Sequence, residues 1–277
     1  MSSIQHQELL IPSAFGKSMA ADLSYTLGCT TLAIYAHGIN GFKDWGGMEL
    51  IADEFAANNC AFLKFNFSHN GTSLEEVSDF VDLEAYAKDN YSIRQSDLKQ
   101  VLNYVLSDAL PIEVKRIVLI GHSRGGVDTM IFAANSGRVD GLVTWAAPDN
   151  ANTPWSTWDA KRLKQWKKTG RTFLKNGRTG QDMPLDYQLF EDFSQNASKY
   201  DPKQIASQIT IPWLIVHGAE DTAVSVDEAK TLSSLQPMAR LVILPEAGHT
   251  FDRSHPLTEP ELPAATRQLI TQTLGFI

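Results

Sequence analysis

Residues 116–127 read RIVLIGHSRGGV, and this stretch decides the fold. After Arg116 it begins with a short apolar run, which is typical of a central strand buried on both faces. The pentapeptide Gly121-His122-Ser123-Arg124-Gly125 follows, and a helical pattern resumes over 127–134. A G-x-S-x-G sequence between a strand and a helix predicts a sharp turn that holds the serine hydroxyl out at the end of a sheet.

On both sides of this turn, short apolar runs alternate with helical patterns along most of the chain. This alternation predicts an α/β fold in which helices flank a mainly parallel central sheet. Strands are predicted over 31–36, 61–67, 116–120, 139–145, 211–216 and 240–244. Helices are predicted over 51–58, 93–106, 127–134, 227–235 and 263–274.

The alternation stops between residues 148 and 207, where no strand-like run occurs and the composition becomes polar, basic and rich in tryptophan. A structureless loop of about sixty residues inside a compact domain would be unusual. We therefore expect a mostly helical cap over 148–207, inserted between two late strands of a core formed by 1–147 and 208–277.

The bulk properties limit the classes of function. The chain has 277 residues with 43% hydrophobic and 20% charged, which suits one large domain or a domain with an insertion. A net charge of -8 argues against broad nucleic-acid binding.

No run of about 18 apolar residues predicts a membrane helix, and no leader pattern is present, so a cytoplasmic location is expected. Cys29 and Cys60 are expected to be buried thiols. The sequence makes no prediction of oligomeric state.

A serine hydroxyl needs a base to become a nucleophile, and the base needs a third group to orient it. His249 follows the strand over 240–244, and Asp221 follows the strand over 211–216. The carboxyl ends of parallel strands meet at one edge of a sheet, so these loops should lie beside Ser123. The chain order Ser, Asp, His is the one expected when a G-x-S-x-G turn carries the nucleophile. The sequence therefore predicts a catalytic triad of Ser123, Asp221 and His249.

Other residues compete for these roles. Glu220 is an alternative for the acid, and Asp227 is a more distant one. His255 lies near the proposed base, but Pro256 and the nearby charges indicate an exposed loop. Within the turn, His122 is expected to point away from the substrate, and His217 is expected to pack at a strand end.

The tetrahedral oxyanion formed during attack needs preorganised N–H donors. One predicted donor is the backbone N–H of Arg124, directly after the nucleophile. The second comes from the loop HGING over 37–41, where the N–H of Ile39 is favoured over that of Asn40. An ordinary glycine turn is the alternative for this loop.

Five segments together resemble the α/β-hydrolase superfamily over essentially the whole chain: HGINGF, FNFSHNGTS, GHSRGG, HGAEDTAVS and AGHTF. The nearest likeness is to cinnamoyl/feruloyl-esterase-like carboxylesterases and dienelactone-hydrolase-like proteins. This resemblance implies the α/β-hydrolase fold and hydrolysis of small-molecule carboxylic esters through an acyl-enzyme, with no metal and no cofactor. Residues 66–71 depart from the esterase pattern, because they lack its second acidic and glycine positions.

The nucleophile type narrows the resemblance further. Dehalogenases and epoxide hydrolases of this fold use an aspartate, and dienelactone hydrolases use a cysteine, where this chain has Ser123. Thioesterases, acylaminoacyl-type peptidases and carbon–carbon bond hydrolases would use the same triad, so they stay open. A non-catalytic ligand-binding protein on a hydrolase scaffold is the rival from another class.

Asn40, His69, Trp155, Trp158 and Arg178 are candidates for the substrate pocket. For the two tryptophans, packing within the cap is an equal alternative. The basic residues concentrated in the cap either form a solvated face or bind an anionic group, with Arg178 as the favoured ligand. These residues are Lys161, Arg162, Lys164, Lys167, Lys168, Arg171, Lys175 and Arg178.

Overall fold

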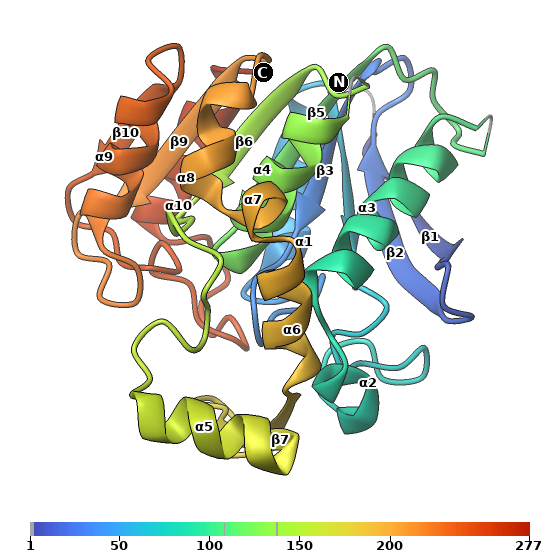
Figure 1. The fold of residues 1–277 in the computed structure, drawn as a ribbon. Coiled ribbons are helices and arrows are strands. Elements are labelled where there is room, and N and C mark those ends of the chain that lie inside the picture. The colour runs from blue at the N-terminus through green and yellow to red at the C-terminus, as the bar shows by residue number, and fades with distance from the viewer. Residues whose placement is uncertain (1–2, 108, 137) are drawn as a thin grey trace.

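A computed structural model describes residues 3–107, 109–136 and 138–277 of the chain (Figure 1). An eight-stranded sheet runs through its centre in the order β1-β2-β4-β3-β5-β6-β9-β10. Along this order the strands from β4 to β10 are parallel, whereas β1 and β2 are antiparallel to their neighbours. The strands are β1 Gln5–Pro12, β2 Ser18–Tyr25, β3 Thr31–Ala36, β4 Cys60–Phe65, β5 Arg116–His122, β6 Gly141–Trp145, β9 Trp213–Gly218 and β10 Arg240–Leu244. The mainly parallel sheet predicted from the sequence is confirmed.

Helices cover both faces of this sheet and create two apolar cores. Helices α1 and α10 pack on one face, and α3, α4 and α9 pack on the other. None of the helices in the described part of the chain is both long and apolar enough to cross a bilayer. The helices are α1 Met48–Ala57, α2 Leu83–Ala87, α3 Tyr91–Val105, α4 Arg124–Asn135, α5 Ala160–Thr169, α6 Gln188–Gln195, α7 Ala197–Tyr200, α8 Pro202–Ile205, a 3-10 turn Ala206–Gln208, α9 Val226–Leu235 and α10 Ala264–Leu274.

The register of the central strands brings their carboxyl ends to one edge. Ala36, the last residue of β3, lies opposite Gly121 of β5, and His122 at the end of β5 lies opposite Trp145 of β6. The loops after these strands therefore start side by side. Ligands of open α/β sheets bind outside this carboxyl edge, so the register fixes where a site can form.

The structure adds an N-terminal hairpin to the strands expected from the sequence. No strand was expected before Thr31, but β1 and β2 pair along their whole length from Gln5↔Tyr25 to Pro12↔Ser18. In β1 exposed residues alternate regularly with half-buried or buried ones, but only Leu9 and Ile11 are buried, because the strand lies at the edge of the sheet. Its polar residues hide the period-2 pattern that normally reveals a half-buried strand.

The sequence shows no strand-like run in 148–207, but the structure places two strands there among the helices. This segment holds a second, two-stranded sheet, in which β7 Arg171–Lys175 pairs antiparallel with β8 Asp182–Asp186. None of the residues of β7 is fully buried, and the strand carries no apolar run that would reveal it. In Figure 1, α5 and β7 stand apart from the main sheet, while α6 connects them back to it.

Polar contacts attach this inserted segment to the core at two places. Ser92, in the first turn of α3, hydrogen-bonds Asp192 of α6 through its backbone N–H, at 3.1 Å, and through its hydroxyl. At the hairpin, Arg171 donates to both carboxylate oxygens of Glu84, at 2.7 and 2.9 Å. The inserted segment is therefore tied to the region around α2 and α3 from both sides.

Candidate functional site

Ser123 lies in the turn between β5 and α4, with a strained backbone. Its φ is 55° and its ψ is -126°, a combination that costs free energy for any residue with a side chain. Two backbone hydrogen bonds keep it there: its N–H donates to the carbonyl of Trp145 at 2.9 Å, and its own carbonyl accepts from Gly126 at 2.8 Å. The turn therefore presents the hydroxyl at the carboxyl edge of the sheet, where strain is typical of functional residues.

The glycines on either side of Ser123 are required by close packing. A side chain at Gly121 would place its Cβ 2.3 Å from the carbonyl oxygen of Gly125. A side chain at Gly125 would place its Cβ 2.2 Å from the carbonyl oxygen of Ala36, at the end of β3. The helix thus begins in direct contact with the neighbouring strand, which only glycine permits.

Asp221 and His249 come together at the same edge of the sheet. Asp221 Oδ2 lies 2.7 Å from His249 Nδ1 and 3.1 Å from Nε2 of the buried His217. The other oxygen, Oδ1, accepts from the backbone N–H groups of Ala223 and Val224, both at 2.8 Å. Burial alone would raise the pKa of Asp221, but the hydrogen bonds from His217, His249 and Val224 lower it well below its usual range. The carboxylate is therefore ionised and can orient the His249 ring.

His122 connects the His249 loop to the turn that carries Ser123. Its Nε2 lies 2.9 Å from the carbonyl oxygen of His249, and the two rings pack with centroids 5.0 Å apart. Burial and the neighbouring His249 and Arg253 lower the pKa of His122 well below its usual value, so its neutral ring donates Nε2–H to that carbonyl. The residue directly before Ser123 thus binds the backbone of His249.

The loop after β3 packs directly against Ser123. A Cβ on Gly38 would lie 3.0 Å from the Cβ of Ser123. His37 Nδ1 donates to the Gly38 carbonyl at 2.9 Å, and burial together with Arg94 lowers the pKa of His37 to about 3, so its ring is neutral. Within the described part of the chain, no acceptor is hydrogen-bonded to the backbone N–H of Ile39 or of Arg124. Neither N–H group is therefore committed to an internal acceptor.

The competing residues lie elsewhere. Glu220 is exposed, and Asp227 pairs with Lys230 at 2.7 Å on the surface of α9. His255 is not on an open loop: its ring packs edge-on against Phe42 at 4.8 Å, and its Nδ1 accepts from a backbone N–H. Among the interactions of the described residues, the imidazole of His249 hydrogen-bonds Asp221 and none of these three.

The two candidate tryptophans pack inside the inserted segment. Trp155 is buried against Trp166, with ring centroids 6.0 Å apart, and it also contacts aromatic rings of α6. Trp158 packs edge-on against the same Trp166 at 5.2 Å, and the guanidinium of Arg162 lies 3.8 Å from its ring centre. Both tryptophans therefore make the contacts expected for packing within the cap.

Asn40 and His69 are also held by internal contacts. Asn40 has φ 55°, and its Oδ1 accepts from the Tyr86 hydroxyl at 2.6 Å. His69 is buried, with Nδ1 2.8 Å from the Ser68 hydroxyl and its ring edge-on to Phe15. Asn40 belongs to the loop beside Ser123, whereas His69 faces the N-terminal hairpin.

Arg178 lies at the turn of the β7–β8 hairpin and reaches back to the core. Its Nη2 donates to Asp79 Oδ1 at 3.3 Å, and its guanidinium carbon lies 5.7 Å from the ring centre of Phe42. It is also close enough to His255 to contribute, after burial, to the lowered pKa of that ring. Arg178 is therefore near both the loop that follows Ile39 and the loop that follows His249.

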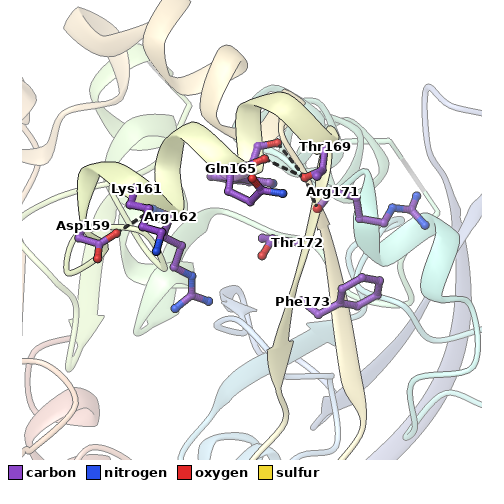
Figure 2. A pocket seen from close by; sticks show the side chains of 9 residues that line it. Asp159, Lys161, Arg162, Gln165, Thr169, Arg171, Thr172 and Phe173 are labelled. Atoms are coloured by element: carbon purple, nitrogen blue, oxygen red, sulfur yellow. Dashed lines mark hydrogen bonds between the residues drawn. The ribbon is translucent and has the colours of Figure 1, made fainter.

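A cavity with a volume of about 520 Å³ lies within the inserted segment (Figure 2). Figure 2 shows Arg162 from α5 and Phe173 from β7 on opposite sides of this hollow. Ser123, Asp221 and His249 do not line it, so it is separate from the site described above. Its lining residues are Asp159, Lys161, Arg162, Gln165, Trp166, Thr169, Arg171, Thr172 and Phe173.

A buried ionic cluster centred on Arg94, next to the turn of Ser123, was not predicted from the sequence. The side chain of Arg94 is buried and donates to Asp89 and Asp128. A signal for it was present: Arg94 shares a helical face with Leu98, Val101 and Val105, all of which are buried. A charged residue on an apolar face predicts a buried partner.

Comparison with known proteins identifies the family. The sequence profile of the Alpha/beta hydrolase family matches residues 33–264. No curated protein matches the chain in sequence. Among solved structures, Est1E from Butyrivibrio proteoclasticus is similar with 18% identity and TM-score 0.64, over 96% of this chain and 95% of that chain. A putative hydrolase from Agrobacterium vitis reaches TM-score 0.75 at 15% identity, over 99% of both chains.

A dienelactone hydrolase from Anabaena variabilis is similar with TM-score 0.65 and 14% identity, over 99% of this chain and 96% of that chain. At these identities the likenesses establish a shared fold. The resemblance inferred from the sequence motifs is confirmed, because the profile covers most of the chain and every strand from β4 to β10. The chain belongs to the Alpha/beta hydrolase family.

Proposed function

We propose that this protein is a serine hydrolase that cleaves carboxylic esters of small molecules through an acyl-enzyme. The observation that carries the proposal is the hydrogen bond between Asp221 and His249, at 2.7 Å, at the same sheet edge as a serine in a strained turn. An acid, a base and a hydroxyl in this order fulfil the requirements of nucleophilic catalysis.

In the proposed mechanism, His249 accepts the proton of Ser123 while the serine oxygen attacks the ester carbonyl. Asp221 keeps the proton of His249 on Nδ1 and stabilises the imidazolium that forms. The N–H groups of Ile39 and Arg124 bind the oxyanion. His249 then protonates the leaving alcohol, and water activated by the same base releases the acid.

The structural relatives favour esters over other substrates. One of the similar structures is Est1E with ferulic acid bound, at TM-score 0.67 and 18% identity. Another is named a dienelactone hydrolase. A panel of ester, thioester and amide substrates separates the proposed esterase from a thioesterase or a peptidase that uses the same triad, and a β-diketone extends the panel to carbon–carbon bond hydrolysis.

The central experiment compares wild type with Ser123→Ala. We expect wild type to hydrolyse p-nitrophenyl acetate and butyrate and to be labelled by a fluorophosphonate, and we expect the variant to lose both. Turnover that persists in Ser123→Ala would show that another group is the nucleophile. A wild type that neither turns over nor reacts would favour the non-catalytic binding protein.

A further inference from the structure

Two arginines and two aspartates are buried next to the turn that carries Ser123. The side chains of Arg94 and Arg124 are each 2% exposed, that of Asp89 is 7% exposed, and that of Asp128 is fully buried. They come from α3, α4 and the connection between α2 and α3. Charged groups are rarely buried unless they are paired, so the fold must bring these segments together accurately.

Arg94 is at the centre of this cluster. Its Nε donates to both carboxylate oxygens of Asp89, at 3.1 and 2.8 Å, and its Nη1 donates to Asp128 at 3.0 Å. The same Nη1 donates to the backbone carbonyl of His37 at 3.3 Å. Because the guanidinium group is rigid and planar, these contacts fix the end of β3 relative to α3 and α4.

The cluster reaches both proposed oxyanion donors. The loop that contains Ile39 begins at His37, whose carbonyl is bound by Arg94. The second donor is the N–H of Arg124, and the side chain of Arg124 lies 3.3 Å from Asp89. Asp89 thus pairs with Arg94, which binds the start of the loop of Ile39, and with Arg124, whose own N–H is the second donor.

We propose that Arg94 and Asp89 are positioning residues for the hydrolysis, which fix the separation between the N–H groups of Ile39 and Arg124. The inference rests on the proposed function, and neither side chain touches the reacting atoms. Oxyanion donors have to lie roughly 2.7–3.1 Å from the developing charge. A displacement of about 1 Å can reduce the rate on the order of 100-fold.

A role in stability alone explains the cluster poorly. Apolar side chains of similar volume often stabilise a core as well as a buried ion pair does. Moreover, Arg124 Nε and Nη2 and Asp128 Oδ1 have no hydrogen-bond partner among the described residues. Unpaired buried groups oppose folding, whereas a defined geometry at the two donor segments is a benefit that apolar packing does not supply.

The test uses Arg94→Met, which removes the guanidinium, and Asp89→Asn, which is nearly isosteric. We expect kcat, measured per fluorophosphonate-reactive site, to fall about 10- to 100-fold in Arg94→Met while KM changes little. Inhibition by a trifluoromethyl ketone, whose serine adduct carries an oxyanion, should weaken by the same factor. Binding of the carboxylate product, which forms no tetrahedral adduct, should stay unchanged.

Lys64→Met is the matched control. Lys64 is also a buried cation bound to two carboxylates, Asp22 and Asp44, but it contacts neither donor segment. We expect it to lower the melting temperature and to leave kcat per reactive site and ketone affinity unchanged. If Arg94→Met does not fold, Asp89→Asn tests the proposal. We expect it to lower kcat per reactive site and ketone affinity in the same direction, by smaller factors.

The proposal is overturned if the variants at Arg94 and Asp89 lose only melting temperature, with kcat per reactive site and ketone affinity as in wild type. Failure of the proposed function looks different: Ser123→Ala would then keep turnover, or the wild type would not react with the fluorophosphonate. The two failures are therefore distinguishable in one set of measurements.

Discussion

Asp221 and His249 are 28 residues apart in the chain, yet Oδ2 of the acid lies 2.7 Å from Nδ1 of the imidazole. The carboxylate is fully buried, whereas the histidine side chain is 22% exposed. Ionisation of the acid is maintained by hydrogen bonds from its neighbours, which lower its pKa against the effect of burial. A charged acid on Nδ1 leaves Nε2 of His249 as the acceptor that a serine proton needs.

Asp221→Asn should lower kcat on the order of 1,000- to 10,000-fold, because the amide no longer holds the required tautomer of His249. The neighbouring Glu220→Gln is the control, since Glu220 is exposed and does not contact the ring. Steady-state kinetics with p-nitrophenyl butyrate measures both. A large loss in Glu220→Gln with activity retained in Asp221→Asn would reverse the assignment of the acid.

Gly38→Ala should reduce kcat/KM roughly 100-fold while the protein stays folded. Its new Cβ would lie 3.0 Å from the Cβ of Ser123 and 3.1 Å from the carbonyl of His122, so the loop and the serine have to separate. Gly248→Ala, on the loop of His249, is the control because nothing lies within 4 Å of its added Cβ. Equal activity of the two variants would contradict a close contact at Gly38.

Ser123→Gly should be more stable than Ser123→Ala, by about 1 kcal/mol in the free energy of unfolding. Glycine adopts the positive φ of 55° without strain, whereas alanine keeps the Cβ that causes it. The gain is limited because glycine also makes the unfolded chain more flexible. Urea denaturation of the two inactive variants measures the difference, and equal midpoints would show that the strain released does not exceed the entropy that glycine adds to the unfolded chain.

Asp97→Asn should change how stability depends on pH. Burial raises the pKa of Asp97 to about 7, although a hydrogen bond from the Ser68 N–H opposes the rise. Between about pH 4, where an unfolded aspartate ionises, and about pH 7, the folded state therefore holds the proton more tightly than the unfolded chain. Wild type loses stability as the pH rises through this window.

The amide introduced by Asp97→Asn cannot ionise, so its contribution to stability is independent of pH. Melting temperatures from pH 4 to pH 8 should therefore show the variant gaining on wild type as the pH rises, on the order of 1 kcal/mol for each pH unit within the window. Parallel curves for the two proteins would mean that Asp97 ionises as it does in the unfolded chain.

Arg178→Ala should raise KM for anionic esters by roughly 3- to 10-fold and leave KM for neutral esters unchanged. The reason is the position of Arg178, beside Phe42 and near His255, where an exposed carboxylate is its only ion-pair partner among the described residues. Lys175→Ala is the control, since Lys175 pairs with Asp182 within the hairpin. An unchanged KM for every ester would show that Arg178 does not bind the substrate.

The sequence determined the fold class because the signals for it are local. The apolar run before Gly121, the glycines around Ser123 and the regular alternation of strands and helices each depend on neighbours in the chain. Asp221 and His249 each follow a predicted strand, so the sequence also predicted that their loops lie at one edge of the sheet. Prediction from local signals failed for β1, where Gln5 and Gln7 occupy half-buried positions, and for β7, which has no fully buried residue.

Only the tertiary structure decided which side chains meet. The contacts of Arg94 with the His37 carbonyl, of His122 with the His249 carbonyl and of Arg178 with Phe42 join segments far apart in the chain. Hydrogen bonds and ion pairs depend on distances of a few ångströms, which follow from how the strands register and how the helices pack. Residue types and their spacing indicate which residues could form a site, and the packing of the fold determines which of them are in contact.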